Sequence, residues 1–471
     1  MDFMNFEEVI KEKSVKWLDF RFVDINGRTH HISSPTNNND YYTMIKEGIS
    51  FHVSTIPGLS LGNQNTLYLK PELETAYIDP FSFESTLNIM CSLITAEGII
   101  HPCDSRSIAQ KAEEYLINSG IANRAFFAPE AEFMIFDNIK FGTFNHSSFH
   151  FVESNESEYN SENEFYKGNS AYKIPHQCGK SPTPPLDIHQ DFRNETCNYL
   201  MESGIKVEFH HHEVAAGQVE IVTKYDTLTK SADNLIKYKY IVHNTAKKHG
   251  KFATFMPKPA LYENGNGMHT HISLFRDEIP LFFEKEGYGN LSELALNYLG
   301  GVLFHAPSLI SFTNSSTNSY KRIRPNSGPT NLTFSKFSRS SAIRIPYISN
   351  GFPEQCRLEF RTPDGSCNPY LAFSAILMAG LDGIRNKIDP FKRGYGPIDE
   401  NDDAKINNDL RKAPKSLDES LDHLEIDHNY LMVGGVFSKE IIQTFIRLKR
   451  EEAEKVSSKI HPFEFSLYFS I

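Results

Sequence analysis

The sequence predicts a two-domain protein of the α+β class, on three observations. The chain has 471 residues, a length that allows roughly two to four domains and a large buried core. Its first part reads mostly as short strands, whereas strands alternate with helices in the remainder. We place the boundary near residue 103, which predicts a small domain over residues 1–103 and a larger domain over residues 104–471.

The small domain is expected to begin with a short helix over Phe6–Lys13, followed by a β-hairpin. Apolar and polar residues alternate over residues 18–22, and the Asn-Gly dipeptide at residues 26–27 is typical of a tight turn. Further strands are predicted over residues 66–69 and 87–93.

The larger domain is expected to open with a helix that is capped at residue 104 or 105 and ended by Gly120. Its clearest helix runs from about Asp226 to His249. Two polar stretches, residues 145–170 and 400–422, predict solvated surface loops.

The composition is that of a globular protein. The 36 Phe and 21 Tyr exclude disorder as the dominant state, because aromatic side chains supply a core. With 48 Lys and Arg against 59 Asp and Glu, the net charge is −11, which argues against a protein that coats nucleic acid or anionic lipid.

The sequence also predicts a cytoplasmic location. Its six cysteines form no CxxC pair, and their number is too small for a disulfide framework in a chain of this length. The N-terminus lacks the basic and apolar regions of a signal peptide, and we find no uncharged apolar run of transmembrane length. We therefore expect no membrane partner.

The first chemical signal is a predicted strand over residues 128–136. Alternation places Glu130 and Glu132 on one face of this strand and Phe133 and Ile135 on the other. Two neighbouring carboxylates repel each other unless a positive charge lies between them. The alternative for a single pair is an ordinary solvated strand face.

The same pattern recurs on three further strands, where ionisable or polar residues alternate with apolar ones. These residues are Glu220 on the first strand, His269, His271 and Ser273 on the second, and Arg357, Glu359 and Arg361 on the third. A lone residue of this kind is usually structural. Four strands that each present such groups from one face predict a shared polar cavity.

A cavity rich in carboxylates with one or two imidazoles suits Mg²⁺ or Mn²⁺ better than zinc, because no cysteine lies in the cluster. Residues 294–353 contain no Asp or Glu but include Lys321, Arg322, Arg324, Lys336, Arg339 and Arg344. This segment is either a basic surface patch or a pocket for a polyanion such as nucleotide phosphates. The chain has no GxxxxGK[ST] loop. The residues alone thus predict a metal-dependent enzyme that acts on phosphates.

At these residues the chain resembles the type I, bacterial-type glutamine synthetases, nearly from end to end. The matching motifs are Lys258-Pro259, Asn264-Gly265-Asn266-Gly267-Met268-His269, Asn318-Ser319-Tyr320-Lys321-Arg322, Arg339-Ser340, Ile343-Arg344-Ile345-Pro346 and Asn368-Pro369-Tyr370-Leu371. The resemblance implies a small N-terminal β-grasp-like domain and a larger catalytic domain whose open, antiparallel, barrel-like sheet is flanked by helices. It also implies a dodecamer of two stacked hexamers, with each active site between two subunits.

The resemblance further implies ATP as co-substrate and two Mg²⁺ or Mn²⁺ ions per active site. One ion would be held by Glu132, Glu213 and Glu220, and the other by Glu130, His269 and Glu359. The positions around ATP are matched by Glu208, His271, Ser273, Arg339, Arg344 and Arg357, and those around glutamate by Glu132, Asn264, Gly265, His269, Arg322 and Arg361. Arg339, Arg344 and Arg361 match the groups that steady the transferred phosphoryl.

Three departures from the family pattern converge on the ammonium subsite. The family typically has an aspartate in Phe-Asp-Gly-Ser-Ser-Ile, whereas this chain has His52, which we expect to be the catalytic base. The flap at residues 325–329 is one residue shorter than the family's and has no glutamate, and Lys180 stands where the family has an aromatic residue. The segment at residues 399–403 also lacks the tyrosine that is adenylylated in some relatives, so this control is not expected.

These departures leave three hypotheses. The first is a ligase that phosphorylates the γ-carboxylate of glutamate and forms a γ-glutamyl amide with an amine other than ammonia. The second is an ordinary glutamine synthetase that tolerates a rebuilt ammonium subsite. The third is a catalytically weak homologue that regulates or scaffolds, although the complete set of six metal ligands argues against it. We favour the first.

Overall fold

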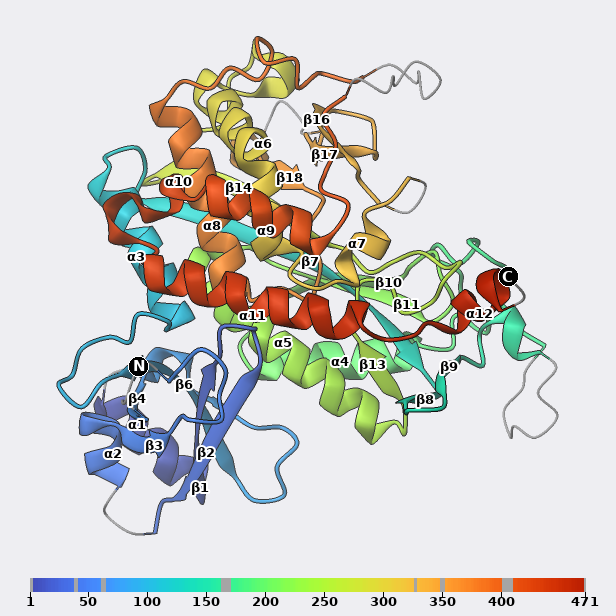
Figure 1. Cartoon of the computed structure of the whole chain (residues 1–471). Helices are drawn as coiled ribbons and strands as arrows, with labels where there is room; N and C mark the ends of the chain where they lie inside the picture. Colours follow the sequence, from blue (N-terminus) through green and yellow to red (C-terminus); the bar gives the residue numbers. More distant parts are fainter. Residues whose placement is uncertain are drawn as a thin grey trace.

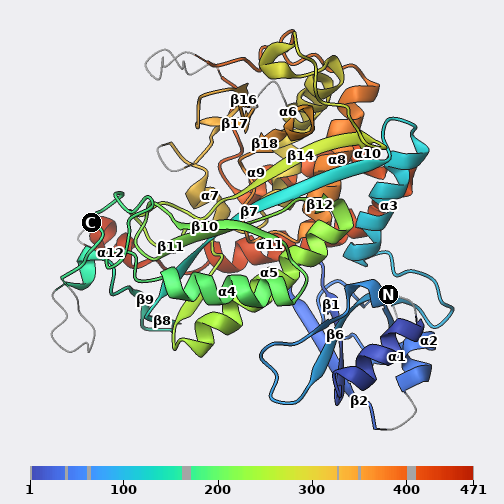
Figure 2. The ribbon, with the colours of Figure 1, turned by 180° about the vertical axis from the view of Figure 1, so that it is seen from behind.

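The computed structural model shows two packed domains of different size. A small strand-rich domain, blue in Figure 1, lies against a larger domain that is built around one long curved sheet (Figures 1 and 2). The residues that the structure describes are 3–37, 41–60, 65–161, 171–325, 328–347, 352–399 and 410–469.

The small domain is a mixed six-stranded sheet with the strand order β2-β1-β6-β4-β3, and β5 pairs with β6. Strands β1 and β6 run parallel, whereas the other pairs are antiparallel. Its elements are α1 (Phe3–Glu12), β1 (Trp17–Val23), β2 (Thr29–Pro35), α2 (Tyr41–Glu47), β3 (Ile49–His52), β4 (Thr66–Pro71), η1 (Leu73–Thr75), β5 (Tyr77–Ile78) and β6 (Thr86–Ile94). The predicted β-grasp-like sheet is therefore confirmed.

The predicted turn of the first hairpin also positions the two domains. Gly27 has a φ of 85°, which an Asn-Gly turn requires. A Cβ at this residue would lie 3.1 Å from the Cα of Asn368 in the larger domain. Asn368 donates a hydrogen bond to the carbonyl of Asp24 (3.0 Å). The hairpin tip is thus packed against the larger domain.

The larger domain contains a ten-stranded sheet with the order β10-β11-β7-β14-β18-β17-β16, to which β12, β13 and β15 add at β7 and β14. All its pairs are antiparallel except β16–β17. The strands of the large sheet are β7 (Arg124–Phe136), β10 (Val207–His212), β11 (Gln218–Thr223), β12 (Asp226–Thr227), β13 (Phe252–Thr254), β14 (Met268–Arg276), β15 (Ile279–Pro280), β16 (Asn331–Ser335), β17 (Ser341–Arg344) and β18 (Leu358–Phe360), whereas β8 (Asn138–Thr143) and β9 (Ser148–Glu153) form a separate two-stranded sheet. The predicted α+β class, with an open antiparallel sheet in the catalytic domain, is confirmed.

Helices pack against this sheet, and α3 and α5 contact its long strand β7 (Figure 2). The predicted helix after residue 104 is present, because the Asp104 carboxylate accepts the amide of Ser107 at its N-terminus. The helices are α3 (Ser105–Asn118), η2 (Glu158–Asn160), α4 (Gln190–Glu202), α5 (Leu228–Lys248), η3 (Tyr288–Asn290), α6 (Glu293–Thr313), α7 (Ser319–Arg322), η4 (Pro353–Gln355), α8 (Pro369–Arg385), α9 (Leu417–Ile426), α10 (Asn429–Met432), η5 (Val433–Gly435), α11 (Lys439–Ser457) and α12 (Pro462–Tyr468).

The two polar stretches are not simply loops. The first contains β9, which pairs with β8 in a long hairpin from Asn138–Glu153 to Thr143–Ser148. Its alternation of Phe with polar residues was hidden by the Asn- and Ser-rich composition around it. In the second stretch, residues 400–409 lie outside the described residues, and α9 begins at Leu417 after the N-cap Ser416.

Helix α6 corrects the expectation that no segment has transmembrane length. Residues Glu293–Thr313 are long and apolar enough to cross a bilayer by length and composition, but 78% of the apolar stretch is buried inside the protein. The helix packs along α8 and α9. Its apolar character is explained by its place in the core, because a helix buried on all sides is apolar all round.

A buried histidine on α6 makes the stability of this core dependent on pH. His305 donates hydrogen bonds to the carboxylates of Asp382 (3.0 Å) and Asp427 (2.9 Å). Burial alone would lower the pKa of His305, but these bonds outweigh it and raise the pKa. The stabilisation is therefore fully present below the pKa of an unfolded histidine, about 6.5, and is lost as the pH rises through the folded pKa.

We expect His305→Gln to lower the free energy of unfolding by about 2 kcal/mol at low pH, because two carboxylates lose a charged partner. The difference between the variant and the unmodified protein should shrink as the pH is raised from about 6 to about 9. Urea unfolding across this range measures it. His423→Gln, an exposed change on α9, is the control. A constant difference at every pH would contradict the assignment.

Candidate active site

The site is built on β7, the longest strand of the large sheet. Glu130 and Glu132 lie on one of its faces, while the intervening Ala131 and the following Phe133 and Ile135 are buried in the core on the other. The apolar face anchors the strand, so the two carboxylates are held side by side. This placement confirms the alternation that the sequence predicts.

The pairing register extends this face across neighbouring strands. Glu132 lies opposite Glu220 of β11, and Glu220 lies opposite His211 of β10. On the other side of β7, Glu130 lies opposite His269 of β14. Directly opposed residues project from the same face of a sheet. One row of ionisable groups therefore crosses the sheet from β10 to β14.

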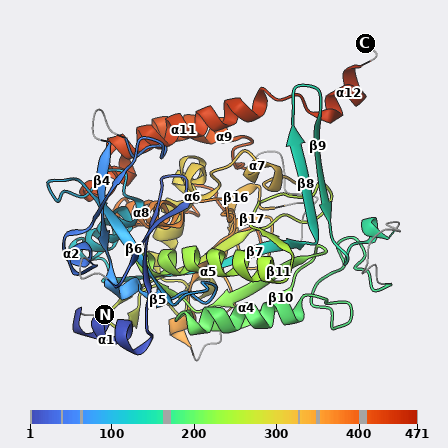
Figure 3. The ribbon, with the colours of Figure 1, turned by 90° about the horizontal axis from the view of Figure 1, so that it is seen from below.

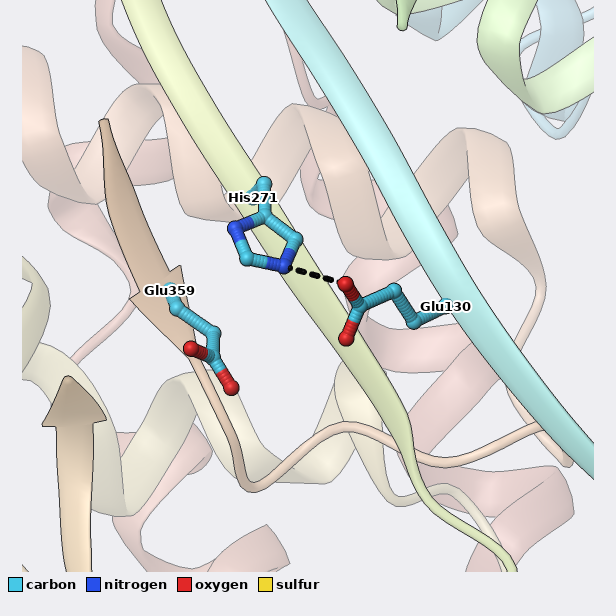
Figure 4. Close-up of side chains that lie close together, drawn as sticks. All are labelled: Glu130, His271 and Glu359. Atoms are coloured by element: carbon cyan, nitrogen blue, oxygen red, sulfur yellow. Dashed lines mark hydrogen bonds and ion pairs between the residues drawn. The ribbon is translucent and has the colours of Figure 1, made fainter. Parts of the chain in front are cut away.

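The row continues from β14 through β18 to β17. His271 of β14 lies opposite Glu359 of β18, which in turn lies opposite Arg344 of β17. Glu130, His271 and Glu359 offer ligand atoms within 4.8 Å of one another, and Figure 4 shows their side chains converging from three strands. His269 also belongs here, because its Nδ1 lies 3.7 Å from oxygens of both Glu130 and Glu359.

Hydrogen bonds set the charge state of this first cluster. Burial would raise the pKa of Glu130, but the nearby imidazoles of His269 and His271 outweigh it and hold the pKa well below its usual range. Nε2 of His271 donates to Glu130 (2.8 Å) while Nδ1 accepts from the guanidinium of Arg357 (3.2 Å). The bond from Arg357 thereby favours the tautomer of His271 that donates to Glu130.

The second cluster consists of His211, Glu213 and Glu220, whose ligand atoms also lie within 4.8 Å of one another. The ring nitrogens of His211 lie 3.5 Å from Glu213 and 3.7 Å from Glu220, and its buried Nδ1 has no hydrogen-bond partner. Burial and the nearby carboxylates of Glu132, Glu130 and Glu213 raise the pKa of Glu220 to about 9. A bound cation would relieve this repulsion.

Glu132 stands between the two clusters and is held in place by neutral donors. Its carboxylate accepts hydrogen bonds from the amide of Gly267 (2.7 Å) and from Gln218 (3.1 Å). Lys180 adds a positive charge, because its ammonium forms an ion pair with Glu213. The carboxylate and imidazole donors of both clusters fit hard divalent cations.

Both clusters open into one cavity of about 930 Å³. The residues predicted from the sequence that line it are Glu130, Glu132, Lys180, Glu213, Glu220, Asn264, Gly265, His269, Arg322, Arg339, Arg344, Glu359 and Arg361. The proline and glycine residues of the flap, Pro325, Gly328 and Pro329, line it too, whereas Asn326 and Ser327 lie outside the described residues. The predicted shared polar cavity is present.

The arginines at the cavity differ in how they are engaged. Arg344 and Arg361 form ion pairs with the two oxygens of Glu359. Burial alone would raise the pKa of Glu359. The net effect is a lowered pKa, because the carboxylate is surrounded by the positive or polar groups of His269, His271, Arg361 and Arg344. Arg339 is exposed at the cavity and, among the described residues, has no carboxylate partner. Its guanidinium is free to contact an anionic ligand.

The predicted glutamate-site residues lie together beside the clusters. Arg322 is buried and donates hydrogen bonds to the carbonyls of Thr362 (2.8 Å) and Arg361 (3.1 Å). A Cβ at Gly265 would lie 2.4 Å from the carbonyl of Pro257 and 3.0 Å from the Arg322 side chain. The glycine therefore allows the loop that carries Asn264 to pack against the aliphatic part of the Arg322 side chain.

The structure places some predicted residues outside the cavity lining. Glu208 is exposed on β10, next to a register shift in its pairing with β11. Ser273 follows His271 along β14 and lies opposite Phe126 of β7. His52 is exposed at the end of β3, the edge strand of the small sheet. The cavity of this chain therefore does not include the expected catalytic base.

The structure also brings in two residues that the sequence reasoning did not single out. His211 joins Glu213 and Glu220, and Gln218 holds Glu132. The His-His-His run at residues 210–212 was visible, and alternation would have selected its middle member together with Glu213. Only the pairing with β11 shows that His211 lies opposite Glu220.

Comparisons with known proteins agree with this geometry. The glutamine synthetase β-grasp domain model matches residues 14–96, and the glutamine synthetase catalytic domain model matches residues 102–468. Glutamine synthetase of Frankia alni is 44% identical over 98% of both chains, and that of Vibrio cholerae is 42% identical over 100% of both. The cryo-EM structure of Plasmodium falciparum glutamine synthetase has a TM-score of 0.90 at 28% identity and covers 99% of both chains.

Two carboxylate–imidazole clusters in one arginine-lined cavity, on a sheet of this topology, thus occur in a chain whose two domains both match models of a single family. Divalent cations held beside arginines are the machinery of phosphoryl transfer from ATP. The chain belongs to the glutamine synthetase family and is an ATP-dependent ligase that joins glutamate to ammonia or another amine.

Proposed function

We propose that this protein is a type I member of the family that transfers the γ-glutamyl group of glutamate to an amine other than ammonia. The observation that carries the proposal is Lys180, whose ammonium lies on the cavity wall in an ion pair with Glu213. A positive charge at this point repels an incoming ammonium ion. In a larger amine, the organic substituent can instead keep the charged nitrogen away from Lys180.

Two Mg²⁺ or Mn²⁺ ions would be held by the two clusters, one by Glu130, His269 and Glu359 and the other by Glu132, Glu213 and Glu220. When bound, such ions neutralise the charge of the nucleotide phosphates and of the transferred group. His271 and His211 lie within reach of the same clusters. His271, held by Arg357, orients Glu130, and His211 is placed to do the same for Glu220.

The protein's own groups would bind and orient the reactants. ATP would lie near Glu208, Ser273 and Arg357, with its γ-phosphoryl beside Arg339, Arg344 and Arg361. Arg322, Asn264 and Gly265 would hold glutamate with its γ-carboxylate towards these arginines. The γ-carboxylate oxygen attacks the γ-phosphorus and ADP leaves, which gives an acyl phosphate that an amine then attacks with loss of phosphate. Preorganised guanidinium groups stabilise the charge that develops on the transferred phosphoryl.

The acceptor subsite would combine Lys180, the flap and His52. The described part of the flap carries no carboxylate, so this wall offers little attraction to a small cation. A neutral imidazole at His52 can accept the proton that the amine loses. Because His52 is exposed and outside this cavity, we propose that it acts at the active site of a neighbouring subunit.

Ordinary glutamine synthesis is the second candidate, and it is favoured by relatives named glutamine synthetase at 42–44% identity. Phosphate release with glutamate, ATP and either ammonium or a panel of primary amines separates the two. We expect at least one amine to exceed ammonium in kcat/KM by about tenfold. If ammonium is better than every amine tested, glutamine synthesis stands and the proposal fails.

Lys180→Phe should raise kcat/KM for ammonium by about tenfold, because it removes the repelling charge and adds an aromatic face that attracts cations. Lys412→Met is the matched control, since Lys412 lines the same cavity but is bound to Asn331 (2.5 Å). Equal responses of the two variants would show that Lys180 does not set the acceptor.

We further propose a cytoplasmic dodecamer of two stacked hexamers, with domains divided near residue 103. The hairpin β8–β9 and helix α12 lie at the same end of the molecule, away from the small domain (Figures 1 and 3). Phe141 and Phe151 of the hairpin are 79% and 61% exposed, and Phe465 and Phe469 at α12 are 58% and 81% exposed. Apolar surface gathered in this way is typical of subunit contacts.

Deletion of residues 460–471 should therefore divide the assembly into single rings, because it removes the exposed apolar side chains of α12. Light scattering coupled to size exclusion measures the mass. Ile426→Ser is the control, since Ile426 is 82% exposed on α9, outside α12 and the hairpin. A truncated protein with the same assembly mass as the full chain would refute the role of α12.

A further inference from the structure

The loop that joins β10 to β11, residues 213–217, carries Glu213 and is shaped by contacts outside the catalytic cavity. The amide of Glu213 donates a hydrogen bond to the carbonyl of Gln218 (2.7 Å), which closes the loop. Gly217 has a φ of 71°, and a Cβ there would lie 2.5 Å from the carbonyl of Ile135 on β7. The loop is therefore a tight turn packed against β7, and the direction of the Glu213 side chain depends on how this turn is held.

A buried carboxylate binds both ends of this turn. Glu156, in the segment that follows β9, is 0% exposed. Its Oε2 accepts hydrogen bonds from the amide of Gly217 (2.6 Å) and from Nε2 of His212 (2.8 Å), and its Oε1 accepts a longer one from the amide of Ile188 (3.4 Å). Because His212 precedes the turn and Gly217 ends it, one carboxylate oxygen ties the two ends together.

His212 extends this contact to a second segment of backbone. Its ring is buried, and its Nδ1 lies 2.8 Å from the carbonyl of Gly179 and 2.6 Å from the carbonyl of Glu213. A carbonyl oxygen can only accept, so Nδ1 carries a proton, while Nε2 donates to the carboxylate of Glu156. His212 is thus a cation paired with Glu156, and charge-assisted hydrogen bonds of this kind are stronger than neutral ones.

The second segment carries Lys180. The amide of Gly179 donates to the carbonyl of Val214 (2.9 Å). A Cβ at Gly179 would lie 2.8 Å from the carbonyls of both Glu213 and Val214, so the two stretches of backbone pack in direct contact. The side chains of Lys180 and Glu213 extend from these stretches to the catalytic cavity and form an ion pair.

Glu156 does not itself reach the reactants. The described lining of the catalytic cavity includes neither Glu156 nor His212. A buried carboxylate is costly unless its partners compensate for the lost hydration, and both hydrogen bonds to Oε2 of Glu156 hold the turn that carries Glu213. The alternative is a pair that only stabilises the fold, so a test must separate metal binding from general stability.

We propose that Glu156 is a positioning residue of the ligase: acting through His212, it sets where Glu213 meets the metal ion and where Lys180 meets the acceptor. The inference rests on the roles proposed above for Glu213 and Lys180. Loss of the Glu156 charge leaves His212 a buried cation without a counter-ion and loosens the turn. Loss of a residue that orients a metal ligand typically costs about tenfold or more in metal affinity.

Titration of the full-length protein with Mn²⁺, followed by the electron paramagnetic resonance signal of the free ion, measures metal binding without turnover. Glu156→Gln keeps the shape of the side chain and removes its charge. We expect one of the two Mn²⁺ ions to bind about tenfold more weakly and the other to change by less than about twofold. Unchanged binding of both ions, or equal weakening of both, would overturn the proposal.

Asp382→Asn is the matched control, because Asp382 accepts a hydrogen bond from the buried ring of His305 (3.0 Å) and belongs to neither carboxylate cluster. It should lower stability and leave the binding of both ions unchanged. If it weakens Mn²⁺ binding as much as Glu156→Gln does, the effect is one of general stability and the positioning role fails. Glu156→Asp is a second variant that keeps a counter-ion for His212, which protects folding, and it should weaken the same ion by a smaller factor.

A double-mutant cycle shows whether Glu156 acts through Glu213. In the Glu213→Gln background the charged ligand is already lost, so adding Glu156→Gln should weaken Mn²⁺ binding by less than about a further twofold. Losses that simply add would refute action through Glu213.

The link to Lys180 has its own readout. Glu156→Gln should change the ratio of kcat/KM between the best amine and ammonium by about threefold or more, and this change should vanish in the Lys180→Phe background. A change that persists there would refute the link. The Mn²⁺ titrations need no acceptor, so they decide the positioning of Glu213 even if ammonium proves the better substrate and the proposed acceptor fails.

Discussion

Glu220→Gln and Glu359→Gln should each reduce ATP-dependent phosphate release by about a thousandfold or more, because each removes a charged ligand from a different cluster. Burial and like charges raise the pKa of Glu220 to about 9, and a bound cation would favour its charged, ligating form at neutral pH. Glu359 holds Arg344 and Arg361 as well. Its loss therefore disturbs both the metal cluster and the arginines.

Steady-state phosphate release at limiting and saturating Mg²⁺ or Mn²⁺ measures this effect. Glu278→Gln is the matched control, since Glu278 is an exposed glutamate that pairs with Arg124 (3.0 Å) near the far end of β7 and β14. If either cluster variant retains near-normal turnover at limiting metal, the carboxylates are not the ligands that we assign. If excess metal largely restores the lost turnover, the assignment is still supported, because such a result shows that the variant binds the metal ion more weakly.

Arg339→Met should lower kcat by about a thousandfold with a small change in the KM for ATP, the pattern of a group that acts on the transition state. Arg339 is exposed at the cavity and free of carboxylates in the described part of the chain. Its charge is thus available to the transferred phosphoryl. Arg344 and Arg361 share the carboxylate of Glu359 as ion-pair partner, so their replacement would also disturb that carboxylate.

Arg393→Met controls for the loss of an exposed guanidinium, because Arg393 lies over the Phe304 ring far along the chain from the catalytic strands. A second measurement follows the chemistry directly. A methionine sulfoximine-type analogue of glutamate should become phosphorylated in the unmodified protein and about a thousandfold more slowly in the variant. A complex with ATP in which the analogue stays intact would contradict transfer to the γ-carboxylate.

Much of the catalytic face could be predicted from local pattern. Side chains alternate along a strand with a period of two, so Glu130 and Glu132 had to share a face if residues 128–136 formed a strand, and β7 bears this out. The same rule placed Glu220, His269 and Glu359 at one cavity. The resemblance of the motifs then predicted the domain architecture that the sheets confirm.

The partition of these residues into clusters depended on register between strands that are far apart in the sequence. His271, rather than His269 alone, reaches Glu130 because β14 pairs with both β7 and β18. His211 enters the second cluster because β10 pairs with β11. A shift of one residue in either pairing would turn these rings to the opposite face. No local pattern in the sequence specifies such a shift.

The packing of the two domains likewise could not be predicted from the sequence. The alternation in β3 says nothing about which cavity His52 can reach, and the structure places it on an exposed edge strand. Asn88 and Lys237 are separated by nearly a third of the chain length, yet they line one cavity. Short-range pattern determines the face on which a side chain lies, because it follows from backbone geometry alone. The partner across a sheet or between domains is decided by the packing free energy of the whole chain.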